Sequence, residues 1–519
     1  SATRRSRASP PRWPRPSPPG GNNPPRPGAP IRALWYRRGL VKLLFVASEL
    51  APYAKTGGLA DVVAALPKTL ARAGHDVRIV VPLYDTAKLD GVTLTQVAEL
   101  TIPLGSHRYQ VRVLALGTAP TIYFLHCPPL YARGRLYTSD ADEHRRFLLL
   151  SYAALELCGR LDFAPDVVHC HDWQAALIPL ILKTIYARDR HLAGARSLLT
   201  IHNLNYQGGF PDSIGPDTNL TQVAHLFHQE LLKAGRVNFL LQGILYADGV
   251  STVSPTYAQE IQTPAHGAGL DGFLRARKTT VVGILNGVDY DEWSPEIDRY
   301  LPARYSAADR SNKAVCKQAL VESLGLPYVP SAPVVGIVSR MASQKGFDLL
   351  GEVLPGLLQR NGFQLTVLGS GEPGLEDMFA RLQRAFPRQV CFYQGFSNKL
   401  AHQIEAGADM FLMPSRYEPC GLNQLYSLRY GTVPIVHKTG GLADTVRPWH
   451  PRTRTGTGFV FEHHDAAGVR WALQAALATY RDPPAWSRLI DNGMAADFSW
   501  ERQARRYEYV YAKLVGADR

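Results

Sequence analysis

The seven residues Lys55-Thr-Gly-Gly-Leu-Ala-Asp61 recur letter for letter as Lys438-Thr-Gly-Gly-Leu-Ala-Asp444. Each copy follows the end of an apolar run and opens a segment of helical character. Glycine lets a backbone approach a ligand closely, and the free N–H groups of a helix N-terminus favour an anion. Common descent of two halves, with the motif kept for packing, is one interpretation. The functional interpretation is that each half directs its glycine turn at one shared cleft, which suits a phosphate-bearing substrate.

Around the two copies, short apolar runs alternate with helix-length segments in two series. Such runs, rich in Val, Ile and Leu, are typical of parallel sheets that are covered by helices on both faces. We therefore expect two doubly wound α/β domains, at 41–290 and 333–500. The break between them, 291–332, contains Pro327 and Pro330 and is expected to be a linker. The expected strands are Val41–Ala47, Val77–Leu83, Thr121–Leu125, Val167–Cys170, Leu198–Ile201, Val250–Val253, Val281–Leu285, Val334–Val338, Gln364–Leu368, Val390–Tyr393, Met410–Met413, Pro434–Val436 and Phe459–Phe461.

Composition excludes several classes of protein. The chain has 519 residues, of which 45% are hydrophobic and 19% charged, as in globular proteins that bury large cores. No apolar run reaches the roughly 18 residues that span a bilayer, so we expect no membrane segment. Six cysteines without CxxC spacing indicate reduced thiols and a cytoplasmic protein.

Positive charge is concentrated at the N-terminus. Residues 1–40 hold nine Arg, ten Pro and no acid, so the rest of the chain carries only +4 of the net +13. The folded part therefore lacks the excess of basic residues that is typical of nucleic-acid-binding proteins, and we expect no nucleic-acid partner. The composition of 1–40 cannot form a core. An interaction arm, a targeting peptide and translated upstream sequence are the three interpretations of this tail.

Polar residues follow the expected strands at one end. In open α/β sheets, ligands bind beyond the carboxyl ends of the strands. Because such residues occur in both series, they predict one active site between the two domains. In the first series they are His171, Asp172, Trp173, His202, Asn203 and Asn286; in the second they are Arg340, Lys345, Glu418, Cys420, Gly421 and Leu422.

The residue types suggest the chemistry. Arg340 and Lys345 are two cations near one strand end and suit a diphosphate leaving group. Each candidate also has a simpler interpretation. The two cations would be solvated surface charges, and Glu418 the charge at a helix N-terminus. Asp172 would cap a helix that starts near Trp173, and His202 would be a core histidine.

Other motifs are weaker. Gly369-Ser-Gly-Glu-Pro-Gly374 matches GxGxxG but lacks the acid about 20 residues on that a dinucleotide site needs. No distant Cys/His set completes a zinc site around His169-Cys170-His171. Asp140 and Asp142 resemble the metal-binding pair of some sugar-nucleotide enzymes, although a solvated loop is the simpler interpretation. The chain has neither a GxSxG elbow nor a GxxxxGK[ST] loop.

Taken in order, these motifs resemble the glycogen and starch synthases, a family of retaining glycosyltransferases that use ADP-glucose. The resemblance runs from about Val41 to about Leu514. It rests on Lys55-Thr-Gly-Gly-Leu59, His171-Asp-Trp173, His202-Asn203, Ile284-Leu-Asn-Gly-Val-Asp289, Ser339-Arg340, Gln344-Lys-Gly346, Arg416-Tyr-Glu-Pro-Cys-Gly-Leu422 and Asp497-Phe-Ser-Trp500. Asn423 departs from the pattern, since many relatives have a small hydroxyl residue there.

The resemblance implies the GT-B architecture, in which two Rossmann-like domains face each other across a cleft. It also implies a last helix, about 501–519, that crosses back to the first domain. Residue by residue, it implies the following roles: Lys55, Gly57 and Gly58 contact the donor's phosphates; Arg340 and Lys345 neutralise the departing diphosphate, helped by the backbone of Thr439, Gly440 and Gly441; Glu418 and the amides of Cys420, Gly421 and Leu422 hold the glucose hydroxyls; His202 and Asn286 contact the sugar; Asp172 and Trp173 line the acceptor side; and Asn203 belongs to the substrate-binding set.

The implied reaction transfers glucose from ADP-glucose to the non-reducing end of an α-1,4-glucan such as glycogen, with retention at the anomeric carbon. A front-face route is expected, in which the leaving phosphate accepts the proton of the acceptor hydroxyl. Neither a metal nor another cofactor is expected, because the two cations supply the positive charge. A retaining transferase for UDP-glucose or a small acceptor is the nearest rival, and a catalytically silent glucan-binding scaffold is a second. The first glycine motif favours the glucan synthases.

Overall fold

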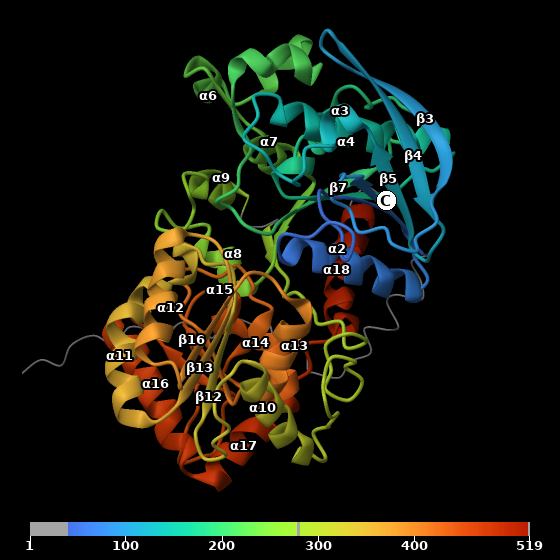
Figure 1. Cartoon of the computed structure of the whole chain (residues 1–519). Helices are drawn as coiled ribbons and strands as arrows, with labels where there is room; N and C mark the ends of the chain where they lie inside the picture. The colour runs from blue at the N-terminus through green and yellow to red at the C-terminus, as the bar shows by residue number, and fades with distance from the viewer. Residues whose placement is uncertain (1–39, 278–280, 517–519) are drawn as a thin grey trace, which may run out of the picture. The chain divides into compact units, whose positions relative to one another are not determined.

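A computed structural model describes residues 40–277 and 281–516. The predicted tail at 1–40 lies outside this range except for Leu40, as do the last three residues of the predicted final helix. The described chain forms two large α/β sheets, each flanked by helices (Figure 1). Among the described helices, none is long and apolar enough to cross a membrane.

The first sheet has nine strands in the order β11-β10-β7-β6-β1-β2-β5-β4-β3. Its strands pair in parallel, except that β4 is antiparallel to both β3 and β5. A small hairpin of β8 (Gly209–Pro211) and β9 (Arg236–Asn238) stands apart. The nine strands are β1 (Lys42–Val46), β2 (Asp76–Pro82), β3 (Thr95–Leu104), β4 (His107–Leu116), β5 (Thr121–His126), β6 (Val167–His171), β7 (Arg196–Ile201), β10 (Gly249–Thr252) and β11 (Val281–Gly283).

The second sheet has six strands, all parallel, in the order β14-β13-β12-β15-β16-β17. The strands are β12 (Val334–Val338), β13 (Gln364–Gly369), β14 (Val390–Gln394), β15 (Met410–Met413), β16 (Val433–His437) and β17 (Phe459–Phe461). Every strand of the two predicted series is present, within a few residues of its predicted limits.

The α-helices cover both faces of each sheet, except over the outer strands β3 and β4 of the first sheet. In the chain segment of the first sheet they are α2 (Gly58–Arg72), α3 (Pro128–Tyr131), α4 (Glu143–Arg160), α5 (Ile178–Lys183), α6 (Gln229–Lys233), α7 (Phe239–Tyr246), α8 (Pro255–Glu260) and α9 (Asp271–Ala276). After it come α10 (Ser311–Ser323), α11 (Leu350–Asn361), α12 (Pro373–Ala385), α13 (Asn398–Gly407), α14 (Asn423–Tyr430), α15 (Gly440–Thr445), α16 (Ala466–Tyr480), α17 (Pro483–Met494) and α18 (Trp500–Gly516).

Side-chain alternation explains why the strands read as continuous apolar runs. In β1, Leu43 and Phe45 enter one hydrophobic cluster, whereas Leu44 and Val46 enter the cluster on the opposite face. A strand buried on both faces needs apolar residues at every position. The six-stranded sheet follows the same rule, with α11, α12 and α16 on one face and α10 and α13 on the other (Figure 1).

The sequence analysis did not predict strands β3 and β4. They are the longest pair in the sheet, ten residues each, but solvent covers one side of them, so exposed and buried residues alternate. A β-bulge between Gln96 and Ala98 interrupts the alternation. A search for continuous apolar runs therefore overlooks them.

The predicted linker at 291–332 is ordered and packs against the second sheet's helices. It contains α10, which lies along α13. Trp293 stacks between the rings of His402 and Tyr426, with centroids 3.7 and 3.9 Å away. The domain limits at 290, 333 and 500 stay predictions.

The last described helix, α18, packs against the first sheet although it follows the second in sequence. It contacts α2 and β6. Tyr507 and Tyr511 are buried in the same cluster as Leu43 and Phe45. Tyr511 also forms a hydrogen bond through its hydroxyl to Nδ1 of His169 on β6, at 2.9 Å.

Candidate active site

One cavity of about 1160 Å³ opens where the carboxyl ends of strands from both sheets meet. Fourteen of the seventeen predicted site residues line it: Lys55, Gly57, Gly58, Asp172, Trp173, His202, Asn203, Asn286, Arg340, Lys345, Glu418, Cys420, Gly421 and Leu422. The remaining three, Thr439, Gly440 and Gly441, are not in its lining.

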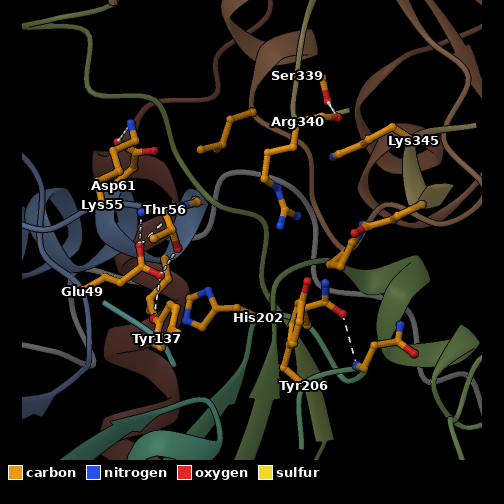
Figure 2. A pocket seen from close by; sticks show the side chains of 18 of the residues that line it. Glu49, Lys55, Thr56, Asp61, Tyr137, His202, Tyr206, Ser339, Arg340 and Lys345 are labelled. Carbon is orange, nitrogen blue, oxygen red and sulfur yellow. Dashed lines mark hydrogen bonds and ion pairs between the residues drawn. The ribbon is translucent and has the colours of Figure 1, made fainter. Parts of the chain in front are cut away.

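The first glycine motif forms the N-terminal turn of α2 and faces this cavity. Its Thr56 and Gly57 amides donate to Oε2 of Glu49 at 2.6 and 3.2 Å, and the Thr56 hydroxyl donates to Oε1 at 2.6 Å. Tyr137 donates its hydroxyl to the same carboxylate at 2.7 Å (Figure 2). The turn is thus held by a carboxylate of the chain itself. Gly58, the next residue, lies beside the Leu422 side chain of the opposite loop.

Lys55 lies beside this turn with its own partner. Its Nζ is 2.6 Å from Oδ1 of Asp61, one helical turn into α2 (Figure 2). Burial raises the pKa of Asp61, and the Lys55 ammonium opposes that rise. Lys55 therefore lines the cavity as one half of an ion pair, and a bound anion has to compete with Asp61 for its ammonium group.

Lys345 and Arg340 approach the cavity from the second sheet (Figure 2). Nζ of Lys345 is 2.6 Å from Oε2 of Glu418, which also accepts the Ser415 hydroxyl at 2.9 Å. In the described part of the chain, no carboxylate lies within ion-pair distance of Arg340. The three charges leave one net positive charge at this wall, which favours the binding of an anionic group such as a diphosphate.

The simpler interpretations of Glu418 and Asp172 are wrong. Helix α14 begins only at Asn423, so Glu418 is not a charge on its first turn. Asp172 makes no side-chain cap bond to the short helix that follows it. Its Oδ1 instead accepts the backbone amide of His202 at 2.6 Å, which ties the ends of β6 and β7 together.

Burial sets the charge of both residues. Burial raises the pKa of Asp172 to about 7, although the backbone amides of His202 and Asn203 oppose the rise. Burial also lowers the pKa of His202 to about 3, so this imidazole is neutral near pH 7. Its Nε2 lies 2.9 Å from Nδ1 of the buried His171. One ring therefore donates to the other, and His202 enters the cavity in a fixed orientation.

Trp173 is held edge-on by a cluster of aromatic rings. Its ring meets that of Phe147 at 4.8 Å, nearly perpendicular. Gly208 lies so close that a Cβ there would be 2.3 Å from the indole, and its φ of 62° is one that glycine tolerates best. The tryptophan that was predicted for the acceptor side thus lines the cavity in one orientation.

The second glycine motif does not line the cavity, and the role of its backbone at the diphosphate stays a prediction. The Gly440 amide and the Thr439 hydroxyl both donate to Oε1 of Glu260, each at 3.0 Å. The Gly441 amide donates to the carbonyl of Glu418 at 3.1 Å. These donors already have partners within the chain, and the turn is buried beneath the Glu418 loop.

The weaker motifs have structural roles. Asp140 and Asp142 both pair with Arg133, at 2.7 and 2.8 Å. Within the described ranges, no group of three or more His, Cys, Asp or Glu side chains is placed to hold a metal ion. Gly369 is the last residue of β13 and lines the cavity, although its motif lacks the acid of a dinucleotide site.

Sequence reasoning missed several cavity residues. Glu49 stands at the carboxyl end of β1, a position at which a polar residue can be sought by the rule used elsewhere. Tyr206 and Phe396 belong to no motif, yet their rings are 54% and 75% exposed beside the cavity and free to stack on a ligand. Asn423 donates its side-chain amide to the carbonyl of Val338 at 3.2 Å, which fixes its position in the lining.

Known proteins are similar to this chain over most of its length. Residues 42–276 match the family described as starch synthase catalytic domain, and residues 328–493 match glycosyl transferases group 1. The glycogen synthase of Koribacter versatilis is 47% identical over 91% of this chain and 98% of its own length. That of Myxococcus xanthus is 46% identical over 92% and 100%.

Solved structures agree with the sequence matches. The catalytic domain of starch synthase IV from Arabidopsis thaliana, bound to ADP and acarbose, superposes with a TM-score of 0.87 at 35% identity, covering 92% of this chain and all of that one. Sucrose-phosphate synthase from Thermosynechococcus elongatus, at 19% identity and a TM-score of 0.58 over the same shares, has the same fold. The two sheets thus form the predicted GT-B architecture. On this combination of sequence, fold and cavity, the chain belongs to the glycogen and starch synthase family of glucosyltransferases.

Proposed function

We propose that this chain transfers glucose from ADP-glucose to the non-reducing end of an α-1,4-glucan, with retention of anomeric configuration. The observation that carries the proposal is the wall formed by Arg340, Lys345 and Glu418 opposite the first glycine motif. It combines a net positive charge with a glycine turn in one cavity. The related starch synthase IV, which was solved bound to ADP and acarbose, supports a donor that contains adenosine diphosphate and a glucan-like acceptor.

The leaving group is the part of the substrate for which the charges are best suited. As the bond from the anomeric carbon to the diphosphate oxygen breaks, negative charge develops on that oxygen. Preorganised cations stabilise such charge most strongly when they need not reorganise. Arg340 can approach without first breaking an ion pair, whereas Lys345 shares its charge with Glu418.

The cavity carboxylates favour a front-face route. A double displacement needs a free carboxylate nucleophile beside the anomeric carbon. Six carboxylates line the cavity, and each already accepts bonds within the protein: Glu49 from the glycine turn, Asp61 from Lys55, Asp140 from Arg133, Glu143 from Arg146, Asp172 from backbone amides, and Glu418 from Lys345.

In the front-face route, the acceptor's 4-hydroxyl attacks on the side that the diphosphate leaves. The new carbon–oxygen bond forms, the old one breaks with its electron pair on the diphosphate, and the hydroxyl proton passes to a diphosphate oxygen. The protein contributes orientation and electrostatic stabilisation. Neutral His202 can form a hydrogen bond to the sugar without adding charge near the developing cation.

The test is transfer of labelled glucose to glycogen from ADP-glucose and from UDP-glucose at equal concentrations, with and without EDTA. We expect strong preference for ADP-glucose, no effect of EDTA, and an α-linked product by NMR. A preference for UDP-glucose would refute the proposed donor but keep the reaction class. Absence of transfer from both donors would refute the function and favour a glucan-binding scaffold. A cytoplasmic location is part of the proposal, supported by six cysteines that are all reduced in the structure.

A further inference from the structure

The seven residues Ser254–Glu260, here called the α8 bracket, comprise Ser254 and helix α8. They follow β10 of the first sheet, and none of them lines the cavity. Nevertheless, helix α8 packs closely against α15, which belongs to the second sheet. The bracket is therefore a direct contact between chain segments that carry the two walls of the cavity.

Two carboxylates make this contact reciprocal. Asp444 of α15 accepts the Thr256 amide at 2.8 Å and the Thr256 hydroxyl at 2.7 Å, on the first turn of α8. Glu260, at the end of α8, accepts the Thr439 hydroxyl and the Gly440 amide on the first turn of α15. Each helix thus receives at its N-terminus an acid from the other, the arrangement that the helix dipole favours.

The two copies of the glycine motif share this chemistry. In the first copy Glu49 accepts from the threonine hydroxyl and the first glycine amide, and in the second copy Glu260 accepts from the same two groups. In both places, the turn donates hydrogen bonds from its threonine hydroxyl and first glycine amide to a glutamate carboxylate. The difference is the source of the acid, which comes from the same sheet in the first copy and from the other sheet in the second.

The second glycine turn supports the Glu418 loop directly. A Cβ on Gly440 would lie 2.0 Å from the Glu418 carbonyl oxygen, and a Cβ on Gly441 would lie 2.1 Å from that of Cys420. Ser254 donates its hydroxyl to the Pro419 carbonyl at 2.6 Å. Because these contacts are this close, the loop cannot shift without the turn and the bracket.

The bracket also contacts the opposite wall. Tyr257, which is buried, accepts the backbone amide of Leu204 at 3.1 Å. Leu204 directly follows His202 and Asn203. The bracket therefore holds the loop after β7 through Tyr257 and the loop after β15 through Ser254.

We propose that the α8 bracket is a positioning element that fixes the Glu418–Leu422 loop relative to the His202–Asn203 loop, with Glu260 as its principal residue. The proposal rests on the proposed function for its kinetic test, because the loops hold the donor sugar only in that reaction. Misplacing a reacting group by about 1 Å can cost on the order of a hundredfold in rate. Loss of the bracket should therefore lower kcat more than it raises KM.

The experiment compares three substitutions in one helix. Glu260→Ala removes the acceptor, Glu260→Gln keeps an oxygen acceptor in the same place, and Gln259→Ala changes an exposed neighbour. We expect Glu260→Ala to lower kcat at least about tenfold with KM for ADP-glucose within about threefold. We expect Glu260→Gln to stay within about threefold of the wild-type kcat and Gln259→Ala to be unaffected.

A second readout does not need turnover. Hydrogen exchange should show faster exchange at the Gly440 and Gly441 amides in Glu260→Ala, but not in Gln259→Ala. Faster exchange with unchanged kcat would overturn the positioning role. If Glu260→Ala does not fold, Thr256→Val, which removes only one hydroxyl bond, should still lower kcat at least about fivefold, and a kcat within about threefold of the wild-type value would overturn the proposal. A wild-type chain without transferase activity would refute the proposed function, while the exchange experiment would still test whether Glu260 holds the turn.

Discussion

Arg340→Ala and Lys345→Ala should separate catalysis from stability, because only one of the two cations has a buried partner. Each substitution removes one group that stabilises the leaving diphosphate, so each should lower kcat about a hundredfold, equivalent to about 2.7 kcal/mol. Arg340 is exposed and has no carboxylate within ion-pair distance in the described ranges, so its loss should change the free energy of unfolding by less than about 0.5 kcal/mol.

Lys345→Ala should also destabilise the fold. It leaves the Glu418 carboxylate, whose side chain is 7% exposed, with only the Ser415 hydroxyl. Breaking a fully buried pair costs about 3–5 kcal/mol, and because Lys345 is 17% exposed we expect about 2–3 kcal/mol. Adding Glu418→Gln removes the uncompensated charge and should recover part of this stability without recovering activity.

The assays are urea unfolding and steady-state transfer from ADP-glucose, both on protein with wild-type circular dichroism. Equal destabilisation by the two single substitutions would refute the charge assignment. Wild-type turnover in either variant would remove that cation from the mechanism.

Three further outcomes are expected. The stability of Asp172→Asn relative to wild type should be greater at pH 8 than at pH 5. The pKa of Asp172 is about 7 in the folded state and about 4 in the unfolded state, so the wild type loses stability as the pH rises through this interval. A constant difference between the urea midpoints of the two proteins from pH 5 to pH 8 would contradict the raised pKa. Asn423→Thr should change KM for ADP-glucose by less than about tenfold and leave kcat nearly unchanged, because Asn423 lines the cavity but contacts only the Val338 carbonyl; a hundredfold loss of kcat in kinetic assays would give it a direct role. Deletion of residues 1–40 should leave transfer activity intact, and a large loss in the same assay would mean that the tail acts in the reaction.

The sequence predicted most of the fold and of the site for one physical reason. Parallel strands place their carboxyl ends at one edge of a sheet, so the polar residues that follow the strands of each series could be assigned to one end of that sheet. The occurrence of such residues in both series then predicted one cleft that both His202 and Lys345 line. Strands β3 and β4 escaped because a half-exposed strand carries a weaker apolar signal than a fully buried one.

The partners of the two glycine turns could not be predicted from the sequence. A helix N-terminus attracts any anion, and nothing local distinguishes a substrate's phosphate from a side chain of the chain itself. Glu260 lies 180 positions before Gly440, so its role becomes visible only once the sheets are assembled. The identical letters of the two copies therefore could not show that the second turn takes its acid from the other sheet.

Helix α18 gives the chain an unusual order of assembly during synthesis. The ribosome makes β1, α2 and β6 early, and α2 covers part of one face of that sheet. The part that Tyr507 and Tyr511 cover stays exposed until Trp500–Gly516 has emerged. The hydrogen bond between Nδ1 of His169 and the Tyr511 hydroxyl likewise cannot form until Tyr511, more than 300 residues later, has been made. A nascent chain that stalls before α18 therefore exposes an apolar surface beside His169, and it cannot complete the core of its first sheet until that helix has been made.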